Sequence, residues 1–165
     1  MRWLIDGYNV IRRDPELSAH EAAGLEAGRV ALLHRLARVA ARVSDPFTVV
    51  FDGARLAGGI PSGGKVQVVF SRPPETADDV LRRLAATLRE GAVVVSSDRA
   101  IQHSVRRAGA VAVGAEAFLR ATGSEGSGDD DEDDDPGPAE RRGPSRRPSR
   151  EARDARRVLR RLTDR

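Results

Sequence analysis

Short apolar runs alternate with longer segments of helical periodicity from the N-terminus to about residue 121. Such runs, bounded by turn residues, are typical of strands in a covered sheet. Strands that alternate with helices predict a parallel sheet with helices on both faces. Right-handed crossovers then bring the carboxyl ends of the strands to one edge. The predicted strands are a first one that ends at Asp6, then 47–51, 66–70, 93–96 and 111–113.

Capping residues mark where the predicted helices begin. Ser18 and Glu21 match the S-x-x-E capping box, so we expect a helix from Ser18 to about Val43. Thr76 and Asp98 occupy the N-cap positions of two later helices, and a last short helix follows the fifth strand. Together with the strands, these helices predict an α/β fold.

The chain changes character after residue 122. Asp129–Asp135 is a run of seven consecutive acidic residues, and 136–150 is rich in Pro, Gly, Ser and Arg. This composition cannot bury a core, so we expect a disordered linker over 123–150. A globular domain would then span 1–122.

Residues 151–165 form a basic amphipathic segment. Ala152, Ala155, Leu159 and Leu162 are spaced for one face of a helix, and arginines surround them. A helix of this length is marginal in isolation. We therefore expect the segment to fold when something binds it.

Composition narrows the classes of protein. The chain has no cysteine, which excludes disulfides and thiolate metal sites. No apolar stretch approaches the roughly 18 residues of a membrane span, and the N-terminus enters strand-like sequence without a signal peptide. We expect a soluble, cytoplasmic protein with no membrane contact. The net charge of +3 includes a modest basic excess in the first 123 residues, which permits a nucleic-acid partner.

Three predicted strands deliver an aspartate at their carboxyl ends: Asp6, Asp52 and Asp98. Ligands of open α/β sheets bind at that edge, and carboxylates that meet there repel one another unless a cation lies among them. Oxygen ligands suit Mg²⁺ or Mn²⁺. The pattern predicts a divalent-metal site. Each aspartate alone has a structural alternative, as part of an Asp-Gly turn or as a helix N-cap.

Three further polar residues lie close to these strand ends. Asp78 and Asp79 open the helix that Thr76 caps, a position that acidic residues also favour for the helix dipole alone. Their side chains point about 100° apart, so we expect only one to face the cleft strongly. Asn9 could offer a neutral oxygen to a metal, or be an ordinary turn residue.

Other kinds of active site lack their sequence signals. His20, His34 and His103 fall on predicted helices without an H-x-x-x-H pair, which favours helix-surface or packing roles over zinc ligation. The sequence contains neither a glycine-rich phosphate loop nor G-x-S-x-G, which argues against P-loop nucleotidases and serine hydrolases.

Four motifs together resemble the YacP-like NYN family, which belongs to the PIN-like nuclease group. They are LIDGYNVI at 4–11, VFDG at 50–53, VFS at 69–71 with ETADD at 75–79, and VSSDRAIQ at 95–102. The resemblance covers about residues 1–121. It implies a PIN-like three-layer α/β/α fold with a mainly parallel sheet, to which the tail adds a disordered C-terminal region.

The same resemblance implies a metal-dependent endoribonuclease that hydrolyses RNA with Mg²⁺ or Mn²⁺. One family member is similar to a ribosome-associated enzyme that cleaves mRNA, so mRNA and the ribosome are implied partners. Gln102 stands where some NYN nucleases carry a further acid, which leaves one metal ion or two open. The implied catalytic and metal-binding residues are Asp6, Asp78 and Asp98, supported by Asn9 and Asp79, to which the strand pattern adds Asp52.

Basic residues around the predicted cleft are candidates for binding RNA phosphates. For any one of them a solvated helix face is the alternative, and Lys65 closes a glycine-rich segment predicted as a flexible loop over 54–65. Tyr8 lies beside the cleft and could stack a base or pack in the core. The candidates are Arg12, Arg13, Lys65, Arg72, Arg99 and Arg106.

Two other functions stay open at the level of sequence. The domain could be a catalytically inactive module that binds RNA or the ribosome, or a structure-specific nuclease that acts on DNA. The acidic run Asp129–Asp135 could compete with RNA for the arginines while residues 151–165 bind RNA or the ribosome. Alternatively, the tail could only increase the solubility of the chain.

Overall fold

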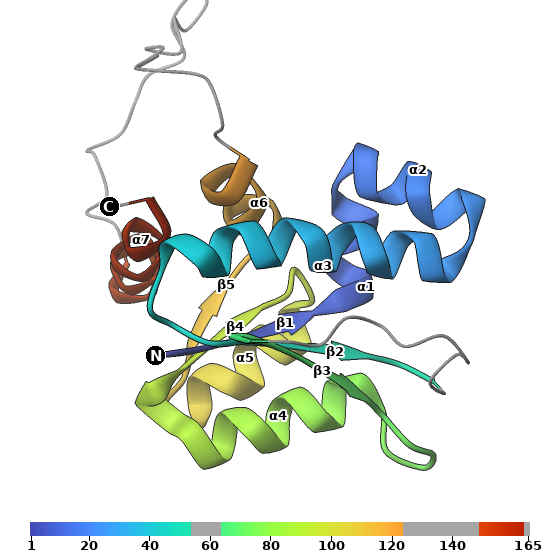
Figure 1. Ribbon diagram of the computed structural model, residues 1–165. Coiled ribbons are helices and arrows are strands. Elements are labelled where there is room, and N and C mark those ends of the chain that lie inside the picture. Colours follow the sequence, from blue (N-terminus) through green and yellow to red (C-terminus); the bar gives the residue numbers. More distant parts are fainter. Residues whose placement is uncertain (54–63, 124–148, 164–165) are drawn as a thin grey trace, which may run out of the picture.

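Five parallel strands form one sheet in the order β3-β2-β1-β4-β5 (Figure 1). The computed structural model describes residues 1–53, 64–123 and 149–163. The parallel sheet predicted from the alternation of strands and helices is confirmed. The strands are β1 (Arg2–Asp6), β2 (Phe47–Phe51), β3 (Val66–Phe70), β4 (Ala92–Val95) and β5 (Val111–Val113).

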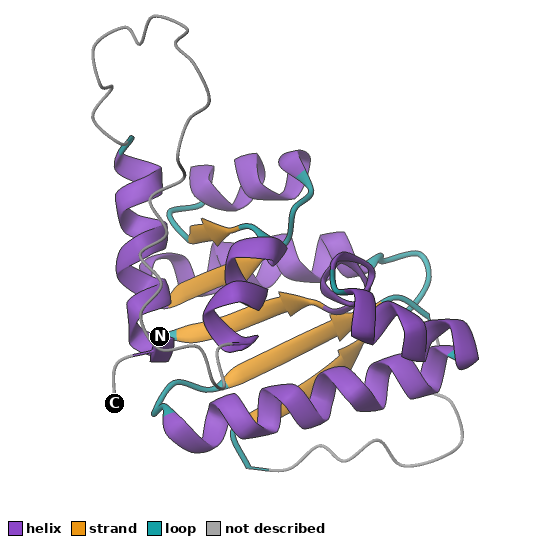
Figure 2. Cartoon of the chain, turned by 90° about the horizontal axis from the view of Figure 1, so that it is seen from above, coloured by secondary structure: helices purple, strands orange, loops and turns teal. Residues whose placement is uncertain are grey.

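Helices cover both faces of the sheet and give three layers (Figures 1 and 2). Among the described helices, none combines the length and the hydropathy that a membrane crossing requires. One layer contains α1 (Gly7–Arg13), α2 (Pro15–Ala23), α3 (Leu25–Arg42) and α6 (Ala115–Gly123), with α7 (Arg150–Thr163) beside α6. The other contains α4 (Ala77–Leu88), the 3₁₀ turn η1 (Arg89–Gly91) and α5 (Arg99–Arg107).

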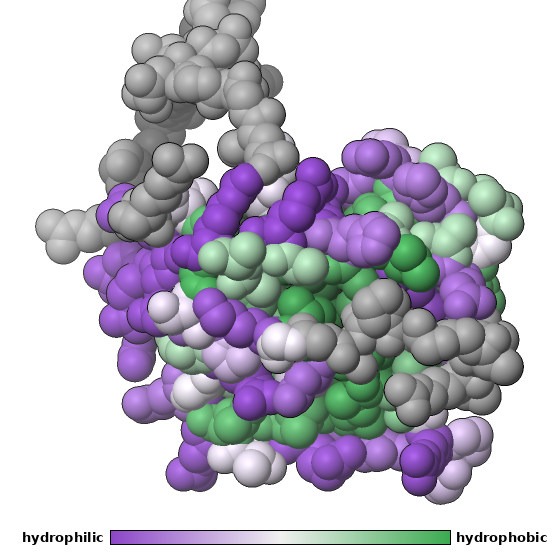
Figure 3. Space-filling view, in the orientation of Figure 1, coloured by the Kyte–Doolittle hydropathy of each residue, from purple (hydrophilic) through white to green (hydrophobic). Residues whose placement is uncertain are grey.

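The central strand shows why both faces are covered. Successive side chains of a strand point to opposite faces. Trp3 and Ile5 of β1 pack in the cluster beneath α3, whereas Leu4 packs in the cluster beneath α4 and α5. All three side chains are completely buried. At the β3 edge, apolar side chains are visible between the two helix layers, and hydrophilic side chains cover the helices around them (Figure 3).

The order of the strands reverses between β1 and β4. From β1, the chain builds β2 and β3 on one side and then returns to place β4 and β5 on the other. A reversal of this kind leaves a crevice at the carboxyl ends of the two strands. Asp6 ends β1 at this point and Ser96 follows β4.

The predicted helix start at Ser18 is wrong. Two helices, α2 and α3, replace the single expected one and meet at Gly24. The N-cap of α2 is Asp14, whose Oδ1 accepts bonds from the backbone N–H groups of Glu16 and Leu17, both at 3.0 Å. Proline follows at the first helical position, where its fixed φ and missing N–H are tolerated. This stronger start signal places Ser18 inside the helix.

The basic segment forms α7 and packs on its own domain. Val158 and Leu162 are buried in the cluster that α3 and α6 cover, and Ala155 and Leu159 pack against it. The expected helix is therefore present, and the surface that it packs against belongs to the same chain. The linker between it and α6, with the acidic run, lies outside the described residues apart from its two ends, as do residues 54–63 of the predicted flexible loop.

Candidate active site

Asp6 is the most enclosed acid of the candidate site. It ends β1 and caps α1, where its Oδ1 accepts a bond from the Asn9 backbone N–H at 3.3 Å. Ser96 Oγ donates to its Oδ2 at 2.8 Å. Burial raises the pKa of Asp6 despite these two bonds. The charges of Asp78 and Asp52 raise that pKa further, so the surroundings of Asp6 destabilise its ionised form.

Hydrogen bonds join the ends of β1 and β4 across the switch point. Asn9 Oδ1 accepts from the Ser97 N–H at 2.8 Å, and Ser96 Oγ accepts from the Asp98 N–H at 3.2 Å. Gln102 donates through Nε2 to the Ser96 carbonyl at 2.7 Å. Through its side-chain oxygen, Asn9 therefore holds the turn after β4 in place.

Asp52 ties the end of β2 to the start of α4. Its Oδ1 accepts from Ser71 Oγ at 2.9 Å and from the Ala77 N–H at 2.6 Å. Since Ala77 is the first residue of α4, these bonds set the position of the helix that carries Asp78. Asp52 thus acts on the site through another element.

Of the two acids in the first turn of α4, Asp78 belongs to the site and Asp79 to the helix cap. Burial raises the pKa of Asp78, Arg82 opposes this at 3.6 Å, and Asp98 and Asp52 reinforce it. Asp79 instead accepts from the Thr76 N–H at 3.1 Å and completes the capping box. The expectation that only one of the pair faces the cleft matches this geometry.

Asp98 is the N-cap of α5. Its Oδ1 accepts from the Ala100 and Ile101 N–H groups at 2.7 and 3.1 Å. The capping bonds use one oxygen, and the charge of Asp98 still acts on Asp78. Asp98 is therefore an N-cap residue, and its role in the site stays a prediction.

The acids have the chemistry for a divalent cation but no preformed cage. Within the described residues, no three His, Asp or Glu side chains lie close enough together to hold a metal ion. Their charges nevertheless act on one another and disfavour ionisation of Asp6 and Asp78. Mg²⁺ is usually held by one or two carboxylates, with waters and substrate phosphates completing the shell. The candidate acids fit an ion that protein carboxylates hold together with water and substrate phosphates.

The predicted cationic residues do not all reach this edge. Lys65 precedes β3 at the amino edge, where its Nζ donates to the carbonyls of Ala40 and Val43 at 3.3 and 2.6 Å. Arg72 directly follows Ser71 after β3, and Arg99 begins α5; both are exposed beside the acids.

The other candidates have partners. Arg13 pairs with Glu116 at 2.6 Å, Arg12 pairs with Glu21 at 3.4 Å, and Arg106 donates to Gln102 at 3.2 Å. Arg72 and Arg99 remain the best-placed phosphate contacts.

Glu116 is an acid that the sequence pattern missed. It lies in the first turn of α6 and accepts a short hydrogen bond from Ser97 Oγ, and this bond lowers the pKa of Glu116. An acid in the first turn of a helix after a strand is the signal that identified Asp78. The same signal would have found Glu116.

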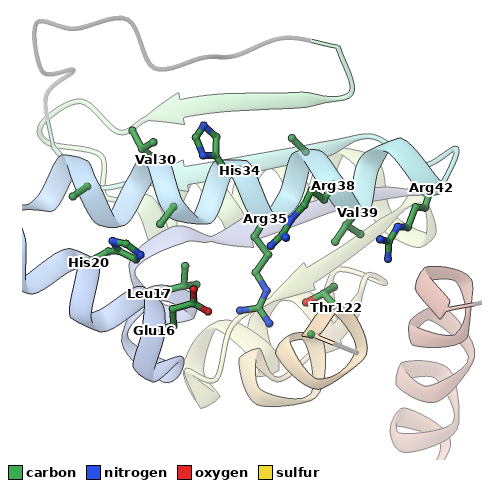
Figure 4. Close-up of a pocket in the computed structure, with 14 residues that line it drawn as sticks. Glu16, Leu17, His20, Val30, His34, Arg35, Arg38, Val39, Arg42 and Thr122 are labelled. Atoms are coloured by element: carbon green, nitrogen blue, oxygen red, sulfur yellow. The ribbon is translucent and has the colours of Figure 1, made fainter. Parts of the chain in front are cut away.

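A cavity of about 830 Å³ lies elsewhere, among α2, α3 and α6 (Figure 4). His20, His34, Arg35 and Arg42 are among its lining residues, which include none of the candidate acids Asp6, Asp52, Asp78 and Asp98. Size alone would favour this cavity over the acidic edge as the active site. The acidic edge carries the perturbed carboxyl groups at the switch point, so we place the candidate active site there.

Comparisons with known proteins identify the family of the chain. Residues 3–158 match the model of the YacP-like NYN domain. The chain is 32% identical over 123 residues to the uncharacterized protein YacP of Bacillus subtilis strain 168, covering 71% of this chain and 72% of that protein. The chain belongs to the YacP-like NYN domain family.

Solved structures of the family share the fold. The crystal structure of Rae1 (YacP) from Bacillus subtilis superposes with a TM-score of 0.64 at 31% identity, over 75% of this chain and 74% of that one. A tryptophan-to-leucine mutant of the same protein superposes with a TM-score of 0.63 at 28% identity, over 75% of each chain. The NYN family is nuclease-like and PIN-like, so its members are hydrolases in kind, and such nucleases typically use divalent metals.

Proposed function

We propose that the protein is a metal-dependent endoribonuclease that hydrolyses phosphodiester bonds of RNA. The observation that carries the proposal is that Asp6, Asp78 and Asp98 each lie at a strand end or a helix start, and that burial and the charges of neighbouring acids raise the pKa of Asp6 and Asp78. Family membership supports the reaction class. Ribosome-associated cleavage of mRNA is the more specific form of the proposal and rests on resemblance alone.

The roles of the residues follow from their positions. Asp6, Asp78 and Asp98 would hold one or two Mg²⁺ or Mn²⁺ ions, and a bound ion would activate water and offset the phosphoryl charge. Asp52 positions the start of α4.

Two kinds of neighbour complete the proposed site. Asn9 and Ser96 fix the β1 and β4 ends relative to each other. Arg72 and Arg99 would bind the phosphates of the RNA chain on either side of the acids.

The decisive assay compares carboxylate-to-amide variants. Asp6→Asn keeps the size of the side chain and one acceptor oxygen for the Asn9 N–H, but it places an N–H donor toward Ser96 and removes the charge. Cleavage of labelled single-stranded RNA should therefore fall more than about 100-fold, as when a transition-state charge contact is lost. Asp78→Asn and Asp98→Asn should behave alike. Asp52→Asn should be milder, because the amide oxygen still accepts from Ser71 and Ala77.

Glu90→Gln is the matched control, since it removes an exposed carboxylate from η1 at the amino edge of β4. It should cleave like the wild type.

The same assay with matched DNA and with EDTA separates the alternatives. RNA binding without metal-dependent product would indicate an inactive module, and preferred cleavage of DNA would indicate a DNA nuclease. Wild-type cleavage by folded Asp6→Asn would refute the acidic site.

A further inference from the structure

The orientation of α7 on the domain is set at both of its ends. Near its C-terminal end, Arg161 donates through Nε and Nη2 to the two carboxylate oxygens of Asp45 at 3.0 and 2.9 Å. Near its start, Glu151 lies 3.6 Å from the guanidinium of Arg106 on α5. Between these contacts, Val158 and Leu162 are buried. The helix therefore presents one constant face to the solvent.

That outward face is a row of arginines. Arg153, Arg156 and Arg160 follow one another at three- and four-residue spacing, which places them on one side of a helix, opposite the buried side chains. All three are exposed, and none forms an ion pair with a described residue. Arg150 and Arg157, by contrast, flank Asp154 at 3.8 and 3.6 Å.

The three arginines of the row do not stabilise the fold. Like charges four residues apart, such as Arg156 and Arg160, destabilise a helix slightly, and the attachment of α7 depends on its other side. A row of exposed guanidinium groups that form no ion pair with a described residue suits a polyanionic partner, because guanidinium binds phosphate oxygens in a bidentate manner.

The Arg160 end of the row lies at the opposite edge of the sheet from the candidate active site. Asp45, which Arg161 contacts, lies two residues before β2 at the amino edge of the sheet, and Figure 1 shows α7 beside the N-terminus. The acids lie at the carboxyl edge, where β1 and β4 end. A short oligonucleotide bound at the acids would not extend along the row, whereas a long RNA would contact both places.

We propose that Arg153, Arg156 and Arg160 form a second contact for the phosphate backbone of long RNA, separate from the cleavage site. The proposal names the substrate class of the proposed nuclease and so rests on that function. The other polyanion at hand is the acidic run of the same chain. It begins six residues after Gly123, which lines the cavity with Arg35 and Arg42, and ends fifteen residues before Arg150. The test separates these two polyanions.

The test uses the full chain with the three arginines changed to glutamine, which keeps the side chains long and helix-compatible. Binding is measured by fluorescence anisotropy in an Asp6→Asn background, to RNAs of about 60 and about 8 nucleotides, over a range of salt. We expect the Kd for the long RNA to rise at least tenfold and the slope of log K against log salt to fall by about two. The Kd for the short RNA should not change.

The matched control removes three exposed arginines from the opposite helix layer: Arg83→Gln, Arg89→Gln and Arg107→Gln. It should leave the long-RNA Kd within about threefold of the parent. Arg→Lys substitutions at 153, 156 and 160 should recover most of the binding, since they restore charge. Circular dichroism and Tm confirm that each variant is folded.

An unchanged long-RNA Kd and salt slope in the glutamine triple would overturn the proposal. If amides in place of the acidic run then lowered the Tm of the parent but not of the triple, the row would instead hold the chain's own acidic run. Failure of the proposed function shows differently. In that case the wild type would cleave neither RNA, while the triple would still lose long-RNA binding.

Discussion

Arg29 is the least expected residue of the structure. It is a cation on α3 with only 3% of its surface exposed, surrounded by the rings of Tyr8, Phe51 and Phe70 at 5.1–5.4 Å. Its Nε and Nη2 donate to the Tyr8 hydroxyl. Its Nη1 is buried and has no hydrogen-bond partner among the described residues. A neutral phenol and three aromatic faces thus stabilise a charge that buried arginines usually share with a carboxylate.

Tyr8→Phe should destabilise the protein more than removal of the charge itself. The change leaves all the buried N–H groups of Arg29 without an acceptor, at a cost of about 2–3 kcal/mol. Arg29→Met replaces the cation with an apolar chain of similar length and should cost less. Urea denaturation gives the free energies of unfolding.

The double variant that combines Tyr8→Phe with Arg29→Met should be more stable than Tyr8→Phe alone, because no buried donor is then left unpaired. Additive losses in this double-mutant cycle would contradict a coupled Tyr8–Arg29 pair.

At the scale of single residues, the positions of the acids were predictable from the sequence, whereas the aromatic surroundings of Arg29 were not. Asp6, Asp78 and Asp98 follow a local rule, since each lies at the end of a strand or the start of a helix. Arg29 sits in a helical pattern among other arginines, and its burial depends on rings that two strands and α1 bring together. No local pattern carries that information.

At the scale of elements, local chemistry identified the caps of α4 and α5 but not those of α1 and α2. Thr76 and Asp98 cap α4 and α5 as expected. The immediate turn from β1 into α1 was missed, because Asp6-Gly7 has the composition of an ordinary turn. Gly7 is required there by tertiary packing: a Cβ at this position would lie 2.2 Å from Cε1 of Phe51. The sequence shows the glycine but not the ring that it accommodates.

The attachment of α7 should depend on pH through Asp45. Partial burial alone would raise the pKa of this carboxyl, but hydrogen bonds from Arg161 and the N-terminal ammonium outweigh that effect and lower it. Its folded pKa therefore lies below the unfolded value of about 3.9. The carboxylate stabilises the fold fully above the unfolded value, and this contribution is lost as pH falls through the folded value.

Asp45→Asn should accordingly lower the free energy of unfolding by about 1 kcal/mol at pH 7, a size usual for a partly exposed ion pair. The difference from the wild type should shrink below about pH 4. Asp154→Asn on α7 is the control, since its pairs with Arg150 and Arg157 are long and exposed. A loss of equal size at pH 3 and pH 7 would show that ionisation of Asp45 does not stabilise the fold.

At the scale of the whole molecule, α7 belongs to the core even though about 25 undescribed residues separate it from α6. Amphipathic spacing predicted the helix, but composition could not show what its apolar side would cover. A chain cut before α7 would expose the neighbours of Val158 and Leu162. Truncation therefore confounds loss of the tail with loss of stability, and the role of the acidic run is better tested by changing its charge.

Replacing Asp129–Asp135 by the corresponding amides in the full chain should raise activity on short RNA at low salt. The run is a tethered polyanion whose effective concentration near the domain is on the order of millimolar, so it competes with RNA for basic side chains such as Arg72 and Arg99. We expect a gain of about threefold or more in kcat/KM at 50 mM salt. The gain should vanish near 0.5 M, where screening extends over only a few ångströms.

A variant with glutamate at the aspartate positions of the run keeps the charge and is the matched control; it should cleave RNA like the wild type. Tm measurements check that both variants keep the stability of the parent. Because the substitutions leave α7 and its contacts unchanged, a gain confined to the amide variant and to low salt can come only from the lost charge. Equal rates for all three proteins across the salt range would show that the acidic run only solubilises the chain.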